Sequence, residues 1–183
     1  TSPTGLITIA GGKLTGYRKM AERVTDIVAS RFAKQYTIGS CHTDTLILKG
    51  GNLKEAGGLR SFIMQKTAEL ALYGITEDTA VRLIRLYGTQ TYQYIKELEN
   101  IHPGLMGVQL PDWLKAQLQY TIKHELVCKP DDFIIRRTAD FYFRRADVVA
   151  YSAELLKAMS ILLQWNDATY AAYTEEWNAL LKK

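Results

Sequence analysis

The sequence predicts a mainly α-helical fold, in which a helical bundle-like domain follows a short strand, turn and helix. From about residue 59 onward, apolar residues recur at spacings of three and four, which is the period of amphipathic helices. Glycine, threonine and aspartate residues stand near the ends of these segments, where helix caps belong, and Asp112 and Asp167 are expected to cap the helices that begin there. Only residues 5–10 and 43–48 show the compact or alternating patterns that are typical of strands.

Residues 1–35 predict a strand, a turn and a helix. Residues 5–10 form a compact apolar run rich in β-branched side chains, which favours a buried strand. Gly11 and Gly12 end the run, and the helix is expected to start close behind them. The helix carries one apolar stripe, made of Met20, Val24, Ile27, Val28 and Phe32. A single buried strand that leads into a Gly-Gly turn is typical of the last strand of a larger sheet, and the sequence contains no partner strands for that sheet.

Residues 36–52 are expected to form a connecting strand and loop, and residues 53–183 the helical domain. Residues 43–48 alternate well enough for the connecting strand, which Gly50, Gly51 and Asn52 end. Six or seven helices are expected after it. They cover residues 59–73, 76–88, 91–99, 112–126, a segment from 131, residues 145–164 and a segment from 167, with a loop over 101–110.

Composition is that of a globular protein with a mild positive charge. The net charge is +4, from 23 Lys and Arg against 19 Asp and Glu, which is compatible with an anionic ligand or an anionic membrane surface and requires neither. The apolar runs are too short to span a bilayer, and no secretory signal pattern is visible. Two cysteines, Cys41 and Cys128, make no disulfide framework, so a reducing cytoplasmic setting with buried free thiols is expected.

The strand, Gly-Gly-Lys and helix sequence suits an anion-binding turn. Glycines let backbone approach a ligand closely, and the start of the following helix presents free N–H groups and a positive dipole end. Lys13 adds a full positive charge there, and Arg18 adds another about one turn later. A Walker A loop does not fit, because Gly16, Tyr17 and Arg18 stand where Gly-Lys-Ser/Thr is needed. The dinucleotide fingerprint is absent. Spacing alone therefore also allows an ordinary tight turn with a solvated lysine.

The segment GLITIAGGKLTGYRKMAE resembles the C-terminal signature of the FAD-dependent glycerol-3-phosphate dehydrogenase family, which includes the bacterial α-glycerophosphate oxidases. The family pattern is filled by Gly11, Gly12, Lys13, Tyr17, Arg18 and Ala21. Three later segments are also similar to the family, in the same order: CHTDTLILKGG at 41–51, LYG at 86–88 and HELVCKPDDFIIRRT at 124–138. Together these segments cover most of the chain.

The resemblance implies a function and a set of site residues. Members of the family oxidise sn-glycerol 3-phosphate to dihydroxyacetone phosphate with FAD as hydride acceptor, and a quinone or oxygen then reoxidises the flavin. The resemblance implies that five residues contact the flavin through their backbone: Gly11, Gly12, Lys13, Leu14 and Thr15. It also makes Lys13 the catalytic residue and makes Lys13 and Arg18 the substrate-binding residues. No metal is implied.

The family's FAD-binding half is not found in the sequence. The dinucleotide fingerprint, the catalytic base and most phosphate-binding arginines are missing, so we expect a truncated piece that is inactive by itself and lacks tightly bound FAD. Its expected partner is the N-terminal FAD domain of the same protein. The unpaired strand at residues 5–10 is expected to pack on the body of the chain itself or to self-associate with a second copy of the chain. The expected location is the cytoplasm, with contact at the inner face of the cell membrane left open.

Several other features have simpler interpretations. Cys41-His42 and the pair His124 and Cys128 lack the paired hook typical of structural zinc sites. The arginines at 136, 137, 144 and 145 are expected to pair with nearby aspartates inside the bundle rather than bind an external anion. The tryptophans at 113, 165 and 177 have helical core spacing. A non-enzymatic basic helical domain that binds nucleic acid through residues 76–94 stays as the alternative, although that region has few cations.

Overall fold

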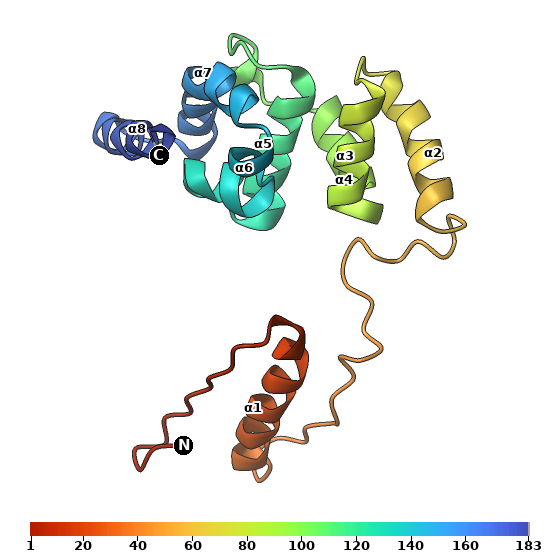
Figure 1. Ribbon diagram of the computed structural model, residues 1–183, viewed down its shortest axis with the longest axis vertical. Coiled ribbons are helices and arrows are strands. Elements are labelled where there is room, and N and C mark those ends of the chain that lie inside the picture. Colours follow the sequence, from red (N-terminus) through yellow and green to blue (C-terminus); the bar gives the residue numbers. More distant parts are fainter. Residues whose placement is uncertain (183) are drawn as a thin grey trace. The chain divides into compact units, whose positions relative to one another are not determined.

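The computed structural model describes residues 1–182 and divides the chain into two compact units (Figure 1). The N-terminal unit is Thr1–Leu48, and the helical unit is Lys49–Lys183. Each unit has its own internal packing, so each is described separately below.

The N-terminal unit consists of one helix and the chain segments on either side of it. A 3-10 turn, η1 (Leu14–Gly16), leads directly into α1 (Tyr17–Phe32). The preceding segment runs back beside α1 (Figure 1), where Arg31 donates a hydrogen bond of 2.7 Å to the carbonyl oxygen of Gly5. The Met20 side chain lies so close to Gly11 that a Cβ there would collide with it. Local contacts of this kind hold the unit together, because none of its residues is buried.

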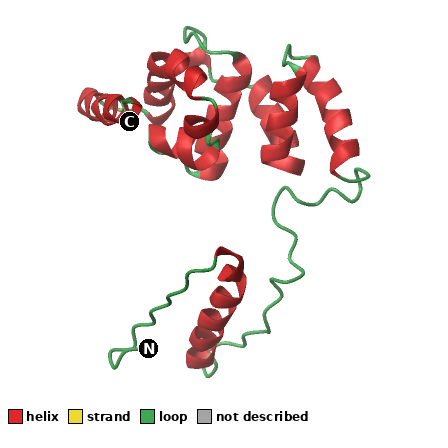
Figure 2. Cartoon of the chain, in the orientation of Figure 1, coloured by secondary structure: helices red, strands yellow, loops and turns green. Residues whose placement is uncertain are grey.

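The prediction of two strands is wrong: neither residues 5–10 nor residues 43–48 form a strand. Figure 2 shows helices and loops, and no strand occurs between residues 1 and 182. A strand is defined by hydrogen bonds to a neighbouring strand, and neither segment has such a partner in the part of the chain that the structure describes. The apolar pattern indicated a preference for extended backbone, but without hydrogen bonds to a neighbouring strand neither segment becomes a β-strand.

Residues 49–182, the described part of the helical unit, form seven α-helices that short turns join (Figure 1). They are α2 (Leu59–Ala71), α3 (Glu77–Tyr87), α4 (Thr91–Glu99), α5 (Asp112–Glu125), α6 (Asp140–Phe143), α7 (Arg145–Leu163) and α8 (Asp167–Leu181). These bounds confirm most of the predicted helices to within a few residues. The short helix α6 was not predicted.

Two expected caps are corrected by the structure. The last helix is capped by Asn166, whose side chain accepts a hydrogen bond of 2.8 Å from the Thr169 N–H, while the predicted cap Asp167 is the first helical residue. Pro111, rather than Asp112, occupies the N-cap position of α5. In both cases the aspartate still lies in the first helical turn, where its charge favours the positive end of the helix dipole.

The helix predicted from residue 131 is a π-helical segment, Asp132–Arg137. The Asp132 carboxylate accepts backbone hydrogen bonds from Cys128 and Lys129, at 3.1 and 2.9 Å. At the other end, the Thr138 N–H donates to the Phe133 carbonyl five residues earlier, at 2.9 Å. This wider winding turns Phe133 into the core, where 1% of its surface is exposed.

The helix α5 lies at the centre of the helical unit. Eight consecutive residues from Leu114 to Thr121 are buried, so every side of the helix is covered over more than two turns. Leu114 and Leu118 face one hydrophobic cluster, while Ala116 and Tyr120 face another. Each pair is spaced by four residues, which places its members on one side of the helix. The helix therefore joins two cores.

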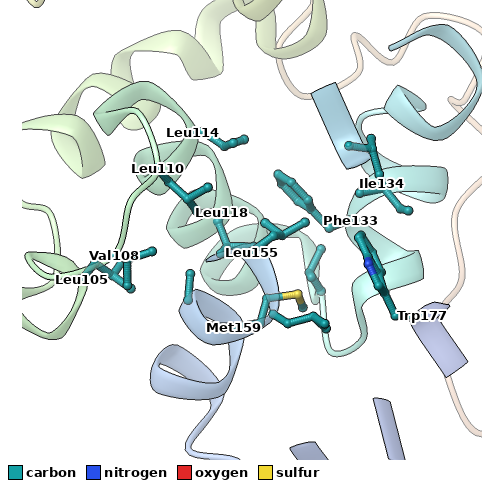
Figure 3. Close-up of a cluster of buried hydrophobic side chains, with 14 residues drawn as sticks. Leu105, Val108, Leu110, Leu114, Leu118, Phe133, Ile134, Leu155, Met159 and Trp177 are labelled. Carbon is teal, nitrogen blue, oxygen red and sulfur yellow. The ribbon is translucent and has the colours of Figure 1, made fainter. Parts of the chain in front are cut away.

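The two clusters contain residues of different helices. The cluster of Ala116 and Tyr120 joins α5 to α2, α3 and α4 through side chains such as Phe62, Leu83 and Tyr94. The cluster of Leu114 and Leu118 joins α5 to the π-helical segment, α7 and α8. Figure 3 labels ten of its side chains, which converge: Leu105, Val108, Leu110, Leu114, Leu118, Phe133, Ile134, Leu155, Met159 and Trp177. The predicted core role is confirmed for Trp177, which is 2% exposed, while Trp113 and Trp165 are partly buried against the clusters.

We predict that Leu118→Ala lowers the free energy of unfolding by about 2–5 kcal/mol, because it leaves a cavity at a fully buried side chain of α5. Urea unfolding of the full chain, followed by far-UV circular dichroism, measures the loss. The matched control is Leu72→Ala, at a leucine that is 85% exposed, with an expected change below about 0.5 kcal/mol. Equal losses for the two variants would contradict the central position of α5.

Candidate functional site

The Gly-Gly-Lys turn ends in an uncapped helix start. Lys13 occupies the N-cap position of η1 in an extended conformation, with φ −97° and ψ 111°. Its side chain makes no capping hydrogen bond, and its carbonyl accepts a hydrogen bond of 3.0 Å from the Gly16 N–H. Because η1 continues into α1, the first N–H groups of the combined helix point out of its N-terminal end. The turn therefore offers backbone donors and a positive dipole end.

The space in front of this turn is open. A Cβ on Gly12 would meet nothing within 4 Å, and Leu14 is 87% exposed. Lys13 is exposed too, and within residues 1–182 it forms no ion pair with a carboxylate. A planar or anionic group can therefore reach the backbone of residues 11–15 without displacing a side chain.

Arg18 extends along α1 in the direction away from the turn. Its Nη1 atom lies 3.4 Å from Glu22 Oε2 and 3.3 Å from Thr43 Oγ1. Thr43 Oγ1 in turn lies 3.0 Å from Cys41 Sγ. The structure thus brings residues 41–43 against the first turns of α1. The sequence analysis did not identify Thr43, because a pairing across 25 residues has no local signal. It also missed Glu22, although the spacing of four residues from Arg18 on a helix is a local signal for an ion pair.

The N-terminal unit presents a large apolar surface. Its exposed apolar side chains come from the predicted strands, from α1 and from the turn and loop segments beside α1: Leu6, Ile9, Leu14, Tyr17, Ile27, Val28, Phe32, Tyr36, Ile38, Leu46, Ile47 and Leu48. Large exposed apolar surfaces often mark places where a protein contacts another element.

In the helical unit, the clustered arginines are mostly paired, as predicted. Arg136 contacts Asp131 at 2.5 Å and Asp132 at 2.9 Å, and Arg144 contacts Asp147 at 2.6 Å. The others bind backbone carbonyls: Arg137 donates to Glu125 at 2.6 and 3.0 Å, and Arg145 donates to Leu181 at 2.6 Å. These arginines therefore serve the packing of the bundle.

A long-range ion pair links three helices of the bundle. Arg82 on α3 contacts Asp140 on α6 at 3.1 Å and lies 3.5 Å from Gln117 Oε1 on α5. Burial raises the pKa of the Asp140 carboxyl above its ordinary value, and the neighbouring Arg82 partly offsets the rise. The sequence analysis paired Asp140 with the nearby arginines, and the structure assigns it to Arg82, 58 residues away.

Glu97 is a buried carboxylate that contacts three polar side chains of α5. Its side chain accepts hydrogen bonds from Lys123 at 2.6 Å and Gln119 at 3.2 Å, and His124 Nε2 lies 3.5 Å away. Burial alone would raise the pKa of Glu97, but the hydrogen bonds from Lys123 and Gln119 outweigh it, so that the pKa lies below the ordinary value. The carboxylate consequently stays charged inside the fold.

The cysteines differ from the expectation of buried thiols. Cys41 and Cys128 are both free and both exposed, because each lies in a loop rather than on a packed helix face. Within residues 1–182, no three histidine, cysteine or acidic side chains gather in an arrangement that could hold a metal ion. No helix in the same range combines the length and the apolar character needed to cross a membrane.

Comparison with known proteins identifies the family. A family model described as the C-terminal domain of alpha-glycerophosphate oxidase matches residues 41–170, which is most of the chain. The chain belongs to this family. The match covers α2 to α7 and the start of α8, so the helical unit is this C-terminal domain.

Curated relatives extend the similarity to the N-terminal unit. The aerobic glycerol-3-phosphate dehydrogenases of two Staphylococcus aureus strains, RF122 / ET3-1 and MRSA252, are each 38% identical to this chain over 98% of its length. The chain covers 32% of each of these relatives, so it spans about a third of their length.

A solved structure gives the same result at the level of the fold. The glycerol-3-phosphate dehydrogenase from Bacillus halodurans, complexed with FAD, superposes with a TM-score of 0.85 and is 33% identical. The similarity covers 95% of this chain and 34% of that protein. The predicted resemblance and the predicted helical C-terminal domain are therefore confirmed.

We predict that Glu97→Gln destabilises the helical unit by about 1–2 kcal/mol at neutral pH, through loss of a charge-assisted hydrogen bond. Because the pKa of Glu97 is lowered on folding, the carboxylate stabilises the fold above the ordinary value of 4.5 and this contribution disappears as the pH falls through the folded pKa. The difference between variant and wild type should therefore narrow in acid. Denaturant unfolding across a pH series measures it, with the exposed Glu55→Gln as control. A difference that is constant with pH would contradict the role of the charge.

Proposed function

We propose that this chain is the C-terminal part of an FAD-dependent enzyme that oxidises sn-glycerol 3-phosphate to dihydroxyacetone phosphate. The observation that supports this most is the family match of the helical unit, together with relatives that are named as dehydrogenases of this substrate. In this proposal, residues 1–35 belong to the FAD-binding domain, residues 36–52 connect, and residues 53–183 form the helical C-terminal domain. The division of the chain after Leu48 is consistent with these bounds.

The turn at the start of α1 has the properties that a flavin edge requires. When bound, FAD supplies the hydride acceptor. The backbone of Gly11, Gly12, Lys13, Leu14 and Thr15 would contact it, since this stretch combines two glycines, an uncapped helix start and open space above Gly12. Backbone N–H donors and a helix dipole stabilise negative charge that develops beside them.

Lys13 is the proposed catalytic residue and a proposed substrate ligand. Its ammonium group is exposed at the same turn and can hold a positive charge next to an anionic substrate. Arg18 is the second proposed substrate-binding residue. Its present contacts with Glu22 and Thr43 leave part of the guanidinium accessible, as 35% of its side chain is exposed.

The proposed partner is an FAD-binding domain that precedes this chain. Relatives about three times as long accommodate such a domain, and the exposed apolar side chains of the N-terminal unit offer it a surface to cover. Without that domain the chain lacks a catalytic base and most of the cofactor contacts, so we propose that it is inactive alone. A quinone or oxygen serves as the final acceptor. The proposed location is the cytoplasm, with peripheral contact at the inner face of the cell membrane.

The alternative of a nucleic-acid-binding helical domain has little support. The helix that would enter the groove, α4, carries one lysine and two glutamates. The Glu97 side chain is buried in the fold, and Lys96 is the only cationic residue of α4. Affinity for duplex DNA needs several lysine or arginine contacts to phosphate, and this helix does not offer them.

A visible absorption spectrum tests the proposal that a preceding domain is needed to hold FAD. The spectrum of the purified chain is recorded alone, and again after FAD is added and the excess is removed. We expect a folded and colourless protein. A stoichiometric flavin band would show that the chain forms a complete flavin site and would overturn the proposal that a preceding domain is needed.

A hybrid enzyme tests the proposed chemistry. In it, this chain replaces the matching C-terminal third of the Staphylococcus aureus dehydrogenase. The hybrid is expected to bind FAD and to reduce a dye when glycerol 3-phosphate is added, and Lys13→Ala should lower turnover by about two to three orders of magnitude. Lys34→Ala, at an exposed lysine beyond the end of α1, is the control. A hybrid that holds flavin and ignores this substrate would contradict the activity, and near-normal turnover of the Lys13 variant would remove Lys13 from the site.

We also propose that the isolated chain self-associates through residues 5–10. Leu6 and Ile9 are 65% and 49% exposed there, and the backbone has no strand partner among the described residues. Sedimentation velocity is expected to show a concentration-dependent larger species that Leu6→Asp removes and Leu72→Asp, at a leucine of the helical unit, leaves unchanged. Fast amide exchange over residues 5–10 at high concentration would contradict the proposal.

A further inference from the structure

A polar cavity lies where the connecting segment enters the helical unit. Its volume is about 160 Å³, and side chains from the connecting segment, the corner between α3 and α4, and α5 surround it. Those with polar groups are Lys49, Tyr87, Gln90, Tyr120, His124 and Glu125. At about 30 Å³ per water molecule, the cavity has room for about five waters or for one small polar molecule.

The backbone of the connecting segment is locked in place beside the cavity. The Gly50 carbonyl accepts a hydrogen bond of 3.0 Å from the Thr89 N–H. Gly50 has φ +92° and Gly88 has φ +51°, and a Cβ on Gly88 would collide with the Gly50 carbonyl. Only glycine permits this approach at both positions. Lys49 is therefore held at the cavity by its neighbour and not by contacts of its own side chain.

Tyr120 is a buried residue whose hydroxyl group forms no hydrogen bond with another described residue. The residue is 2% exposed, and no hydrogen bond to its hydroxyl group is formed within residues 1–182. By contrast, the hydroxyl of the adjacent Tyr87 accepts a hydrogen bond of 2.9 Å from Gln117 Nε2. Since Tyr120 lines the cavity, its free hydroxyl group is available as a hydrogen-bond donor to a bound molecule.

The charges around the cavity leave a cation in excess. Glu125 is balanced by Arg137, whose Nε atom lies 3.6 Å from Glu125 Oε2 and also donates to the Glu125 carbonyl. His124 is turned with Nε2 toward Glu97, at 3.5 Å, and its ring lies against Tyr120. Lys49 lines the cavity without an ion-pair partner in the described part of the chain. Burial raises the pKa of the Glu125 carboxyl above its ordinary value, and the nearby charges of Arg137, His124 and Lys49 partly offset the rise.

We propose that this cavity binds a small oxyanion, such as a phosphate or a carboxylate, between Lys49, Gln90 and Tyr120. Lys49 supplies the charge, while the Tyr120 hydroxyl and the Gln90 amide supply directed donors. A bound anion would tie the connecting segment to α5, so that occupancy would strengthen the attachment of residue 49 to the helical unit. The site is independent of the flavin turn and of the proposed oxidation.

Titration of the full isotope-labelled chain with inorganic phosphate tests this site by amide NMR, with sodium acetate in parallel and sodium chloride of equal ionic strength as reference. Saturable shifts are expected at residues 49–51, Gln90 and residues 120–125. Shifts with phosphate alone would identify a phosphate site, and shifts with both anions a general oxyanion site. Saturation by neither anion, or shifts that chloride reproduces, would overturn the proposal.

Three variants separate the site from general charge effects. Lys49→Gln should weaken binding about tenfold or more, because it removes a charge-assisted hydrogen bond. Tyr120→Phe should weaken it about threefold to tenfold by removing only the hydroxyl. Lys96→Gln removes an exposed lysine from α4 and should leave binding unchanged. Unaltered affinity in the Lys49 variant would overturn the proposal, and circular dichroism of each variant confirms that it is folded.

Discussion

The burial of α5 on every side is the constraint on which the helical unit depends. A helix in this position must satisfy its polar side chains inside the protein, because an unpaired buried amide costs about 1–3 kcal/mol. Gln117 donates to Tyr87, while Gln119 accepts from the His102 N–H at 2.6 Å and donates to Glu97 and Asn100 at 3.2 Å. These bonds fix how α3, α4 and the following loop lie against α5. The two hydrophobic clusters then form on opposite sides of one correctly oriented helix.

The N-terminal unit depends on the opposite situation. It has no buried side chain, and α1 is a helix of 16 residues whose apolar stripe is partly exposed. Helices of this length are marginal in water unless packing covers their apolar face. The contacts from Arg31, Met20 and Arg18 hold the segments of the unit beside one another without forming a core. A unit of this kind suits a surface that is completed by another domain, and it carries the turn that we propose for flavin contact. The helical unit, by contrast, has hydrophobic cores of its own.

Prediction from sequence succeeded where the signal is local. Helix periodicity and the residues at helix ends gave α2, α3, α4, α5, α7 and α8 to within a few residues. It failed for the two strands, since a strand requires a partner that lies elsewhere. The pairing of Arg82 with Asp140 and the network around Glu97 were missed for the same reason: their members are separated by tens of residues. The candidate turn was found because its glycines, lysine and helix start are consecutive, and the Thr43 contact with Arg18 was not.

The sequence by itself determined the family, the helical character of residues 53–183 and the turn that we propose for the flavin. All three depend on residue order, helix propensity or a contiguous motif, which are properties that chain neighbours establish. Tertiary structure alone decided that α5 is the buried centre and that Asp140 belongs to Arg82. It also decided that Lys49 and Tyr120 share one cavity. Those results depend on which distant segments meet, and the free energy that selects the meeting comes from burying apolar surface and satisfying buried polar groups across the whole unit.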